Sequence, residues 1–158
     1  MTAFLLGIDV GTSGSKVLLI DDEGRVLAST TTEYATSTPQ PLWAEQNPSD
    51  WWSATSSSVR RLLEQAQIRP AQVAAVGLTG QMHGLVALDG ASQVLRPCIM
   101  WNDQRTAAEC DWITQRVGER RLLELTGNPV LPGFTAPKIL WVRDHEPEVF
   151  RRIAHILV

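Results

Sequence analysis

The sequence predicts a mixed α/β fold, in which the sheet begins with an antiparallel meander of three strands and helices flank it. Two short apolar runs, residues 4–8 and 17–20, enclose a turn rich in Gly, Ser and Thr. Residues 25–31 alternate between apolar and polar side chains and read as a third strand. The first helical periodicity comes only afterwards, at residues 48–66. This order of elements places the meander first in a sheet that helices then cover.

Composition narrows the class of protein and of partner. The chain has 158 residues, 44% of them hydrophobic, and so is long enough to bury the core of one domain or of part of one. A net charge of -3 without basic runs disfavours a nucleic-acid partner and favours a small molecule. Residues 1–9 lack a basic leader, and no apolar stretch approaches the roughly 20 residues of a membrane span, so we expect a cytoplasmic protein without a membrane partner. Cys98 and Cys110 match no zinc pattern and are expected to be buried and reduced.

The segment after the meander predicts a loop, a helix and another strand. Tyr34–Asn47 shows no period and is expected to be an irregular surface connection. Asn47 suits the cap and Pro48 the first position of a helix. Its predicted apolar face comprises Trp51, Trp52, Thr55, Val59, Leu62, Leu63 and Ala66. Val73–Leu78 is a short uncharged run, typical of a strand covered on both faces.

Downstream, the pattern predicts further short strands and helices. In chain order these are a strand at 85–88, an extended stretch at 94–101, a helix opening at Asn102-Asp103 and running to Val117, a helix at 119–125, a helix from near Pro137, a helical turn at Pro147 and a buried strand at 153–158. Most of the six tryptophans are expected in the core. No repeat or linker interrupts the chain, so we expect one unit along its length, ending within a domain.

The turn between the first two strands has the chemistry of a phosphate site. Gly11 and Gly14 are expected to take positive φ and allow close approach of an anion. The turn N–H groups, with the hydroxyls of Thr12 and Ser13, can donate to phosphate oxygens. The pattern lacks the Gly-Lys-Ser or Gly-Lys-Thr of the helix-opening phosphate loop, so a hairpin version is predicted.

Asp9 ends the first strand directly before this turn. Its carboxylate supplies a hard oxygen for Mg²⁺, through a water or directly. The alternative is an ordinary tight turn with a capping aspartate, which is common in β-proteins. Lys16 ranks last among the phosphate-binding residues, because it fits a solvent-facing strand position equally well.

A second polar group follows two later strands. Met82 and His83 come after the strand ending near Thr79, while Trp101, Asn102 and Asp103 follow the extended stretch at 94–101. Mixed donors and acceptors beside an apolar wall suit the hydroxyls of a polyol. In an open α/β sheet both groups would face one crevice with the first strand's carboxylate. The alternatives are a structural histidine, with the methionine and tryptophan serving as core.

Five stretches together resemble the amino-terminal part of the FGGY family of carbohydrate kinases. They are residues 7–16, 41–48, 80–84, 101–105 and 132–141, and the last fits a signature of a small residue, Thr, Lys, an apolar residue and Trp. This family is similar in fold to heat-shock-70 chaperones and actin. The resemblance therefore implies a ribonuclease-H-like, actin-like ATPase domain.

The resemblance also implies roles for residues and partners. The chain would be part of the sugar-binding domain, a second domain would bind ATP, and the γ-phosphate would pass to the 5-hydroxyl of D-xylulose. By matching position, Asp9 would organise Mg²⁺, Gly11–Ser13 would face the phosphate, and Met82 with His83 would contact the sugar, joined by Asn102 and Asp103. The family's catalytic aspartate and adenine-binding half would follow Val158, so the chain alone is expected to be inactive. A homodimer of the full-length protein is compatible with the resemblance.

Other functions stay open at this point. A related kinase acting on gluconate would share Met-His, but commonly carries Trp-Ala-Asp where this chain has Trp101-Asn102-Asp103. An actin-like nucleotide switch would need the first hairpin and no sugar-binding segment. A non-catalytic sugar-binding protein would keep both segments and lack the catalytic aspartate.

Overall fold

The computed structural model describes residues 3–158, which group into two compact units. The first, here called the sheet unit, comprises the chain up to Ala35 together with Ser49–Gln81. The second, the helical unit, comprises Thr36–Pro48 and Met82–Val158. The sequence pattern suggested one unit along the whole length, because no linker composition marks a boundary. The contacts instead divide the chain, and each unit takes two separate segments of it.

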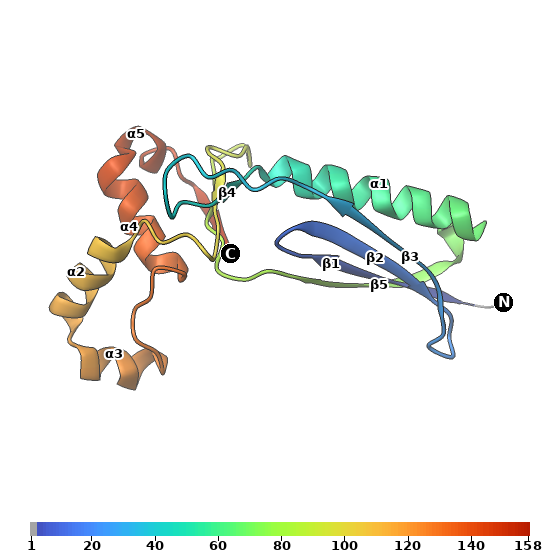
Figure 1. Cartoon of the computed structure of the whole chain (residues 1–158), viewed down its shortest axis with the longest axis horizontal. Helices are drawn as coiled ribbons and strands as arrows, with labels where there is room; N and C mark the ends of the chain where they lie inside the picture. Colours follow the sequence, from blue (N-terminus) through green and yellow to red (C-terminus); the bar gives the residue numbers. More distant parts are fainter. Residues whose placement is uncertain (1–2) are drawn as a thin grey trace. The chain divides into compact units, whose positions relative to one another are not determined.

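The sheet unit contains a four-stranded mixed sheet (Figure 1). Its strands are β1 (Phe4–Val10), β2 (Gly14–Ile20), β3 (Val26–Glu33) and β5 (Val73–Gly80), in the order β3-β2-β1-β5. The first three pair antiparallel, and β5 runs parallel to β1. The predicted three-strand meander is therefore confirmed, with β5 added to its β1 edge by way of a helical crossover.

Helix α1 (Pro48–Ala66) covers one face of this sheet, and the short 3₁₀ helix η1 (Pro70–Gln72) leads from it to β5 (Figure 1). Alternate residues of β1 and β2 point toward α1 and form a core with it, consisting of Phe4, Leu6, Val17, Leu19, Leu62 and Leu63. Hydroxyl pairs extend the contact, since Ser15 and Thr55 lie 2.8 Å apart and Thr32 and Ser58 2.7 Å apart.

The predicted apolar face of α1 is partly wrong. Trp52 is 74% exposed, and the buried positions are Ala54, Ser58, Leu62 and Leu63. Small side chains at 54 and 58 allow the helix to approach the strands closely, where an indole would hold them apart. The predicted face is therefore confirmed at Leu62 and Leu63, with Val59 and Ala66 packed against the same core, and it is wrong at Trp52.

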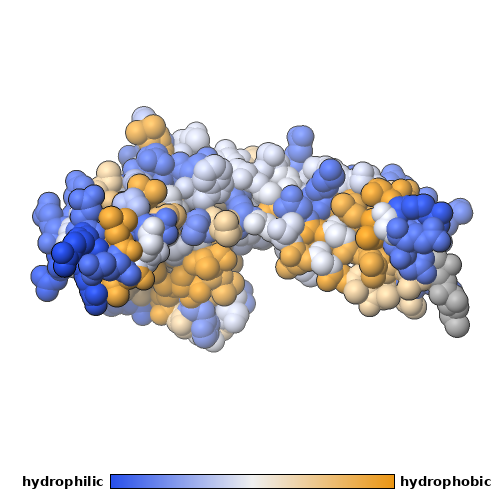
Figure 2. Space-filling view, turned by 90° about the horizontal axis from the view of Figure 1, so that it is seen from below, coloured by the Kyte–Doolittle hydropathy of each residue, from blue (hydrophilic) through white to orange (hydrophobic). Residues whose placement is uncertain are grey.

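Strand β5 also differs from expectation. Its sequence suggested cover on both faces, yet Val76 and Leu78 are 57% and 74% exposed. Within residues 3–158, β5 is an edge strand bonded to β1 alone. Figure 2, which views the molecule from the side away from α1, shows apolar side chains gathered on the sheet unit.

The helical unit combines two small antiparallel sheets with four helices. Strand β4 (Glu45–Gln46) pairs with β7 (Cys98–Ile99), and β6 (Val86–Leu88) pairs with β8 (His155–Leu157). The helices are α2 (Ala107–Val117), α3 (Glu119–Thr126), α4 (Thr135–His145) and α5 (Pro147–Phe150). Leu85, Ile99, Trp141 and Val142 form its buried core. The helices expected near 119–125, Pro137 and Pro147 are thus present, the second beginning at Thr135.

Three predictions for this unit need correction. Helix α2 begins at Ala107 rather than at Asn102-Asp103, because the Asp103 carboxylate accepts hydrogen bonds from the backbone N–H groups of Ala44 and Arg105 and holds the segment as a turn. Residues 34–47 are not wholly a surface loop, since Ala44–Gln46 are buried and β4 lies among them. Strand β8 is present but mostly exposed.

Two further expectations concern particular side chains. Both cysteines are free and buried, as predicted. The expectation that most tryptophans lie in the core is wrong: Trp141 is buried and Trp43 packs against the core, whereas Trp52, Trp101 and Trp112 are exposed. Among the described helices, none combines the length and the apolar character that crossing a membrane requires.

Candidate functional site

The turn between β1 and β2 is a tight hairpin closed by a hydrogen bond from Gly11 N to Gly14 O of 3.1 Å. The prediction of positive φ at its glycines is wrong, since neither Gly11 nor Gly14 adopts it. Gly14 is required for a different reason, because a Cβ there would lie 2.8 Å from the carbonyl oxygen of Thr32 on β3. A Cβ at Gly11 would lie 3.3 Å from Gly14 O. Close backbone packing, rather than a left-handed conformation, explains the glycines.

Tyr34 holds this turn from the end of β3, a role that the sequence analysis missed. Its hydroxyl donates to the carbonyl of Gly11, and its backbone N–H donates to Ser13 O at 3.2 Å. Burial, with the nearby charge of Asp9, raises the pKa of Tyr34 and keeps the phenol protonated as a donor. Thr12 Oγ1 lies 3.4 Å from Gln81 Oε1, just beyond the end of β5. The turn is therefore anchored on both sides and its shape is set before any ligand arrives.

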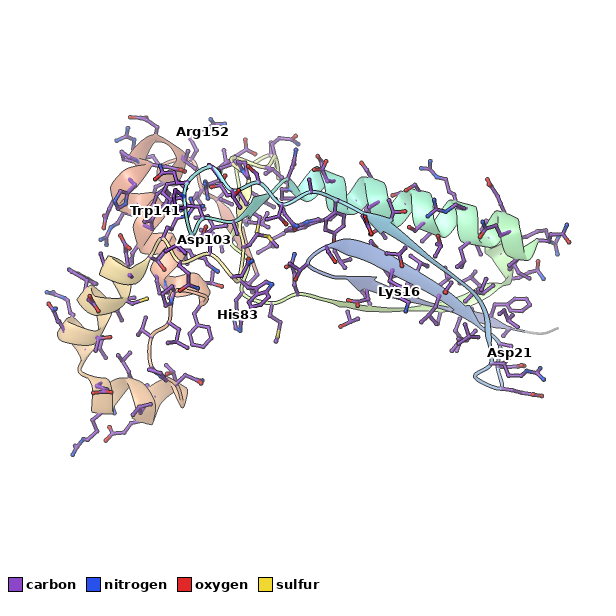
Figure 3. The ribbon with its side chains drawn as sticks, viewed as in Figure 1. Lys16, Asp21, His83, Asp103, Trp141 and Arg152 are labelled. Atoms are coloured by element: carbon purple, nitrogen blue, oxygen red, sulfur yellow. The ribbon has the colours of Figure 1, made fainter. Side chains whose placement is uncertain are left out.

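Asp9 and Lys16 lie in register on neighbouring strands, and Asp9 and Thr79 form the equivalent pair between β1 and β5. These residues line an open concavity of about 450 Å³ that includes Gly7, Leu18, Gly77 and Leu78. Lys16 is labelled on β2 in Figure 3. Asp9 and Lys16 are both exposed. Within residues 3–158, the Asp9 carboxylate has no hydrogen-bond or ion-pair partner, so it caps no turn.

The fit of this site to a cation rests on the donor set. A free, exposed carboxylate offers the hard oxygen that Mg²⁺ prefers. No cluster of three or more His, Cys, Asp or Glu that could hold a metal occurs in the described part of the chain. Asp9 can therefore contribute one ligand or orient a coordinated water, and the remaining ligands would be water and phosphate oxygens.

In the helical unit, Met82 and His83 are both exposed. His83 has φ +67°, a left-handed backbone conformation that is uncommon outside glycine. Its imidazole lies against the ring of Phe134, with 4.9 Å between centroids and 55° between planes. His83 and Phe134 both line a cavity of about 380 Å³ whose other walls come from α2, α3 and the residues that open α4. The histidine is thus held at the edge of a hollow, where a ligand can reach it.

The segment Trp101-Asn102-Asp103 separates into exposed and buried residues. Trp101 and Asn102 are exposed. Asp103 is 0% exposed, accepts a hydrogen bond from Ala44 N at 2.7 Å and forms an ion pair with Arg105 through both oxygens. Asp103 was predicted to contact the sugar, and its position instead makes it an internal brace for the loop.

A buried ionic cluster explains several other residues of the resembling stretches. Glu45 Oε1 lies 2.6 Å from Arg96 Nη2 and 2.8 Å from Arg105 Nη1. The Arg105 guanidinium also stacks 3.7 Å from the Trp43 ring centroid and 4.8 Å from that of Trp141. The resembling stretches include all of these residues except Arg96, and the sequence did not predict that they meet. These residues are far apart in the sequence, so their ion pairs and ring contacts become visible only in the folded structure.

Lys138 of α4 is the other buried charge of this unit. Its side chain is completely buried, and Nζ donates to His83 O at 2.6 Å and to Gly133 O at 2.7 Å. Burial lowers the pKa of Lys138 to about 8. The neighbouring Cys98 thiol, also buried, has its pKa raised to about 12 by desolvation.

The structure thus brings the predicted residues together in two groups. Asp9 lies with Lys16 beside the anchored turn of the sheet unit, and His83 lies with Phe134 in the helical unit. The sequence analysis predicted that Asp9 and His83 face one crevice. These residues belong to different units, so that arrangement stays a prediction.

Comparison with known proteins identifies the family to which the sequence is similar. Residues 4–158 match the N-terminal domain of the FGGY family of carbohydrate kinases. The xylulose kinase of Escherichia coli K12 is 48% identical over 153 residues, which are 97% of this chain and 31% of that protein. The xylulose kinase of Bacillus subtilis 168 is 41% identical over 155 residues, which are 98% of this chain and 31% of that protein.

Solved structures agree with this match. The crystal structure of xylulose kinase from Rhodospirillum rubrum superposes with a TM-score of 0.91 at 30% identity, covering 97% of this chain and 31% of that one. The predicted actin-like ATPase fold class is therefore confirmed. The chain spans about a third of the length of the relatives it matches. On the family match over nearly its whole length, the chain belongs to the FGGY family of carbohydrate kinases.

Proposed function

We propose that this chain is the amino-terminal, sugar-binding part of a cytoplasmic xylulose kinase that transfers the γ-phosphate of ATP to the 5-hydroxyl of D-xylulose. The observation that carries this proposal is the similarity over 97% of the chain to a protein named as a xylulose kinase. In this assignment a second domain, outside residues 1–158, supplies most of the nucleotide site. Any homodimer would belong to the full-length protein.

The helical unit would hold the sugar. The exposed His83 imidazole can donate or accept a hydrogen bond with a ketose hydroxyl, and Asn102 offers both an amide donor and an acceptor. Met82 and Trp101, both exposed, supply apolar surface for the carbon face of the sugar. Asp103 is removed from this set, because both of its oxygens are already bound within the protein.

The sheet unit would hold the transferred phosphate and its cation. The turn from Gly11 to Ser13 would face the phosphate. Gly11 N–H is already bound to Gly14 O and the Thr12 hydroxyl to Gln81, so the donors and positive charge offered to phosphate oxygens are the Ser13 N–H and hydroxyl and the Lys16 ammonium. Asp9 would hold Mg²⁺ directly or through water, and the cation, when bound, neutralises charge that develops on the phosphoryl group. Tyr34 keeps the turn in place, so that little reorganisation is needed on binding.

A substrate panel tests the proposed function. The full-length protein should phosphorylate D-xylulose with a higher kcat/KM than D-gluconate or glycerol, measured by coupled detection of ADP. Equal or greater activity on gluconate would reassign the substrate within the family. Absence of ATP-dependent turnover on every sugar, with the fold intact, would favour the non-catalytic sugar-binding alternative.

A second measurement tests the sugar contacts. His83→Ala should raise the KM for D-xylulose by about tenfold, the cost of one hydrogen bond of roughly 1.4 kcal/mol, and leave the KM for ATP nearly unchanged. His155→Ala is the matched control, because it removes an exposed histidine of the same unit from β8. Similar sugar KM values for both variants would remove His83 from the site.

A further inference from the structure

His83 adopts a backbone conformation that needs support from its surroundings. A positive φ in a residue with a side chain is strained, and such residues persist where neighbouring groups determine their conformation. On the carboxyl side the support is steric, since a Cβ at Gly84 would lie 2.9 Å from Cys98 Sγ on β7. The loop that presents His83 is therefore seated directly on a buried strand.

The second support is the ammonium group of Lys138. Its Nζ donates to the carbonyl oxygens of His83 and Gly133, two residues far apart along the chain. Next to Gly133, Phe134 places its ring against the His83 imidazole. One buried cation thus joins the backbone beneath the imidazole to the backbone beneath the ring that contacts it.

The same cation borders the Trp101 segment. A Cβ at Gly133 would lie 2.7 Å from the carbonyl oxygen of Trp101, so the two backbones are in direct contact. Through Gly133, Lys138 therefore braces both exposed segments that the proposed function assigns to the sugar. These are Met82-His83 and Trp101-Asn102.

Stability alone is a poor explanation for this lysine. Removing a charge from water is costly, and apolar residues of similar volume commonly stabilise a core at least as well. Within residues 3–158, Lys138 forms no ion pair, and the two groups to which its ammonium donates hydrogen bonds are neutral carbonyls. Charge-assisted hydrogen bonds to two separate loops are instead suited to fixing geometry.

We propose that Lys138 is a positioning residue of the sugar site, whose buried ammonium holds the backbone of His83 and Gly133 and so fixes the His83 imidazole against Phe134. The inference rests on the proposed function for the assignment of His83 to the sugar. The geometric part of it, the orientation of the imidazole, is independent of that function.

The first test measures the orientation of the His83 imidazole by NMR in the absence of substrate. In the full-length protein labelled with ¹³C at histidine Cε1, the Phe134 ring current should shift the His83 resonance, which His83→Ala assigns. Lys138→Met should move this resonance toward the value of an unrestrained histidine, while Val142→Ala, a buried change on the same helix, should leave it in place. An unchanged His83 resonance in folded Lys138→Met overturns the proposal.

The second test measures the effect of Lys138 on substrate binding by steady-state kinetics. Lys138→Met should raise the KM for D-xylulose at least tenfold and change the KM for ATP less than twofold, while Val142→Ala should leave both nearly unchanged at a similar loss of melting temperature. Equal effects of the two variants on the sugar KM would show a merely structural lysine and overturn the proposal. A shifted resonance in a protein that phosphorylates no sugar supports the positioning role and refutes the proposed function instead.

Phe134→Leu covers the case in which Lys138→Met does not fold. It removes the ring that the imidazole rests on and keeps an apolar side chain at that position. The proposal expects the His83 resonance to lose its ring-current shift and the KM for D-xylulose to rise by several fold. A sugar KM equal to that of the unaltered protein overturns the proposal.

Discussion

The two units use aspartates near strand ends in opposite ways. Asp9 of the sheet unit is exposed, and its oxygens have no partner within residues 3–158. Asp103 of the helical unit is buried, and its oxygens bind a guanidinium and two backbone N–H groups. Both residues were predicted from sequence as ligand contacts, on similar grounds. The difference teaches that a carboxylate is available to a ligand only where the fold has left its oxygens unused.

The largest expected effect, and the strongest test of the difference between the two aspartates, comes from neutralising Asp9. Asp9→Asn in the full-length protein should lower kcat by about 10²–10³, because a cation and its phosphate lose an anionic anchor in the transition state. The KM for sugar should change little, since in the proposed assignment Asp9 binds the cation and makes no contact with the sugar. Steady-state kinetics measures both values.

Asp22→Asn is the matched control for this prediction, because Asp22 is an exposed carboxylate of the turn between β2 and β3. It should leave kcat and stability unchanged. A normal kcat in Asp9→Asn would mean that the free carboxylate has no role in organising the cation.

The same substitution at Asp103 should act on stability instead. Asp103→Asn leaves the buried Arg105 guanidinium without its charged partner on that side, which should lower the free energy of unfolding by about 3 kcal/mol. Urea denaturation measures this loss. The folded fraction should retain the sugar KM, because Asp103 is not exposed to a ligand.

Asp144→Asn provides the comparison, since it breaks an exposed pair with Arg143 and should leave the free energy of unfolding nearly unchanged. Should Asp103→Asn prove as stable as Asp144→Asn while raising the sugar KM, Asp103 would return to the ligand-binding set.

The turn beside Asp9 offers a smaller effect. Gly14→Ala should destabilise the protein by about 1–3 kcal/mol, because the new methyl group meets the backbone oxygen of Thr32 and the strands must move apart. Gly90→Ala is the control, since a Cβ there meets nothing within 4 Å. Equal melting temperatures for the two variants would show that close approach of β2 and β3 does not require glycine at position 14.

The smallest effect concerns pH and the buried lysine. Burial lowers the pKa of Lys138 from 10.5 to about 8, so between these values the unfolded chain binds more protons than the folded one. Stability therefore rises with pH across this window through Lys138, by about 1 kcal/mol from pH 8 to pH 9. The charged or titratable groups that influence it are Cys98, Asp103 and Arg105.

The Cys98 thiol acts in the opposite direction at higher pH. Its pKa is raised from 9.0 to about 12, so above pH 9 the folded chain retains the proton that the unfolded chain loses, and stability falls. Urea titrations at pH 8 and pH 9 should show the lysine contribution in the unaltered protein and not in Lys138→Met. Lys16→Met, which removes an exposed lysine, should keep it. Loss of the contribution in both variants would refute its assignment to Lys138.

Much of the architecture was determined by local sequence. The apolar runs around the Gly11–Gly14 turn predicted β1 and β2, Pro48 marked the start of α1, and the short helices α3 and α5 began where Glu119 and Pro147 indicated. Such features depend on the period and turn chemistry of neighbouring residues. The motifs at the ends of the strands also identified the family, because their residue types and order are visible without a fold.

Only tertiary structure decided which of these residues are free. Asp103 binds Ala44 N across 59 positions of sequence, and Lys138 reaches His83 O across 55. Ala54 and Ser58 of α1 are buried while Trp52 faces water, and Val76 is exposed although its apolar run predicted a strand covered on both faces. Burial and pairing are sums over contacts between distant segments, so two aspartates that were both predicted as ligand contacts can end with opposite roles.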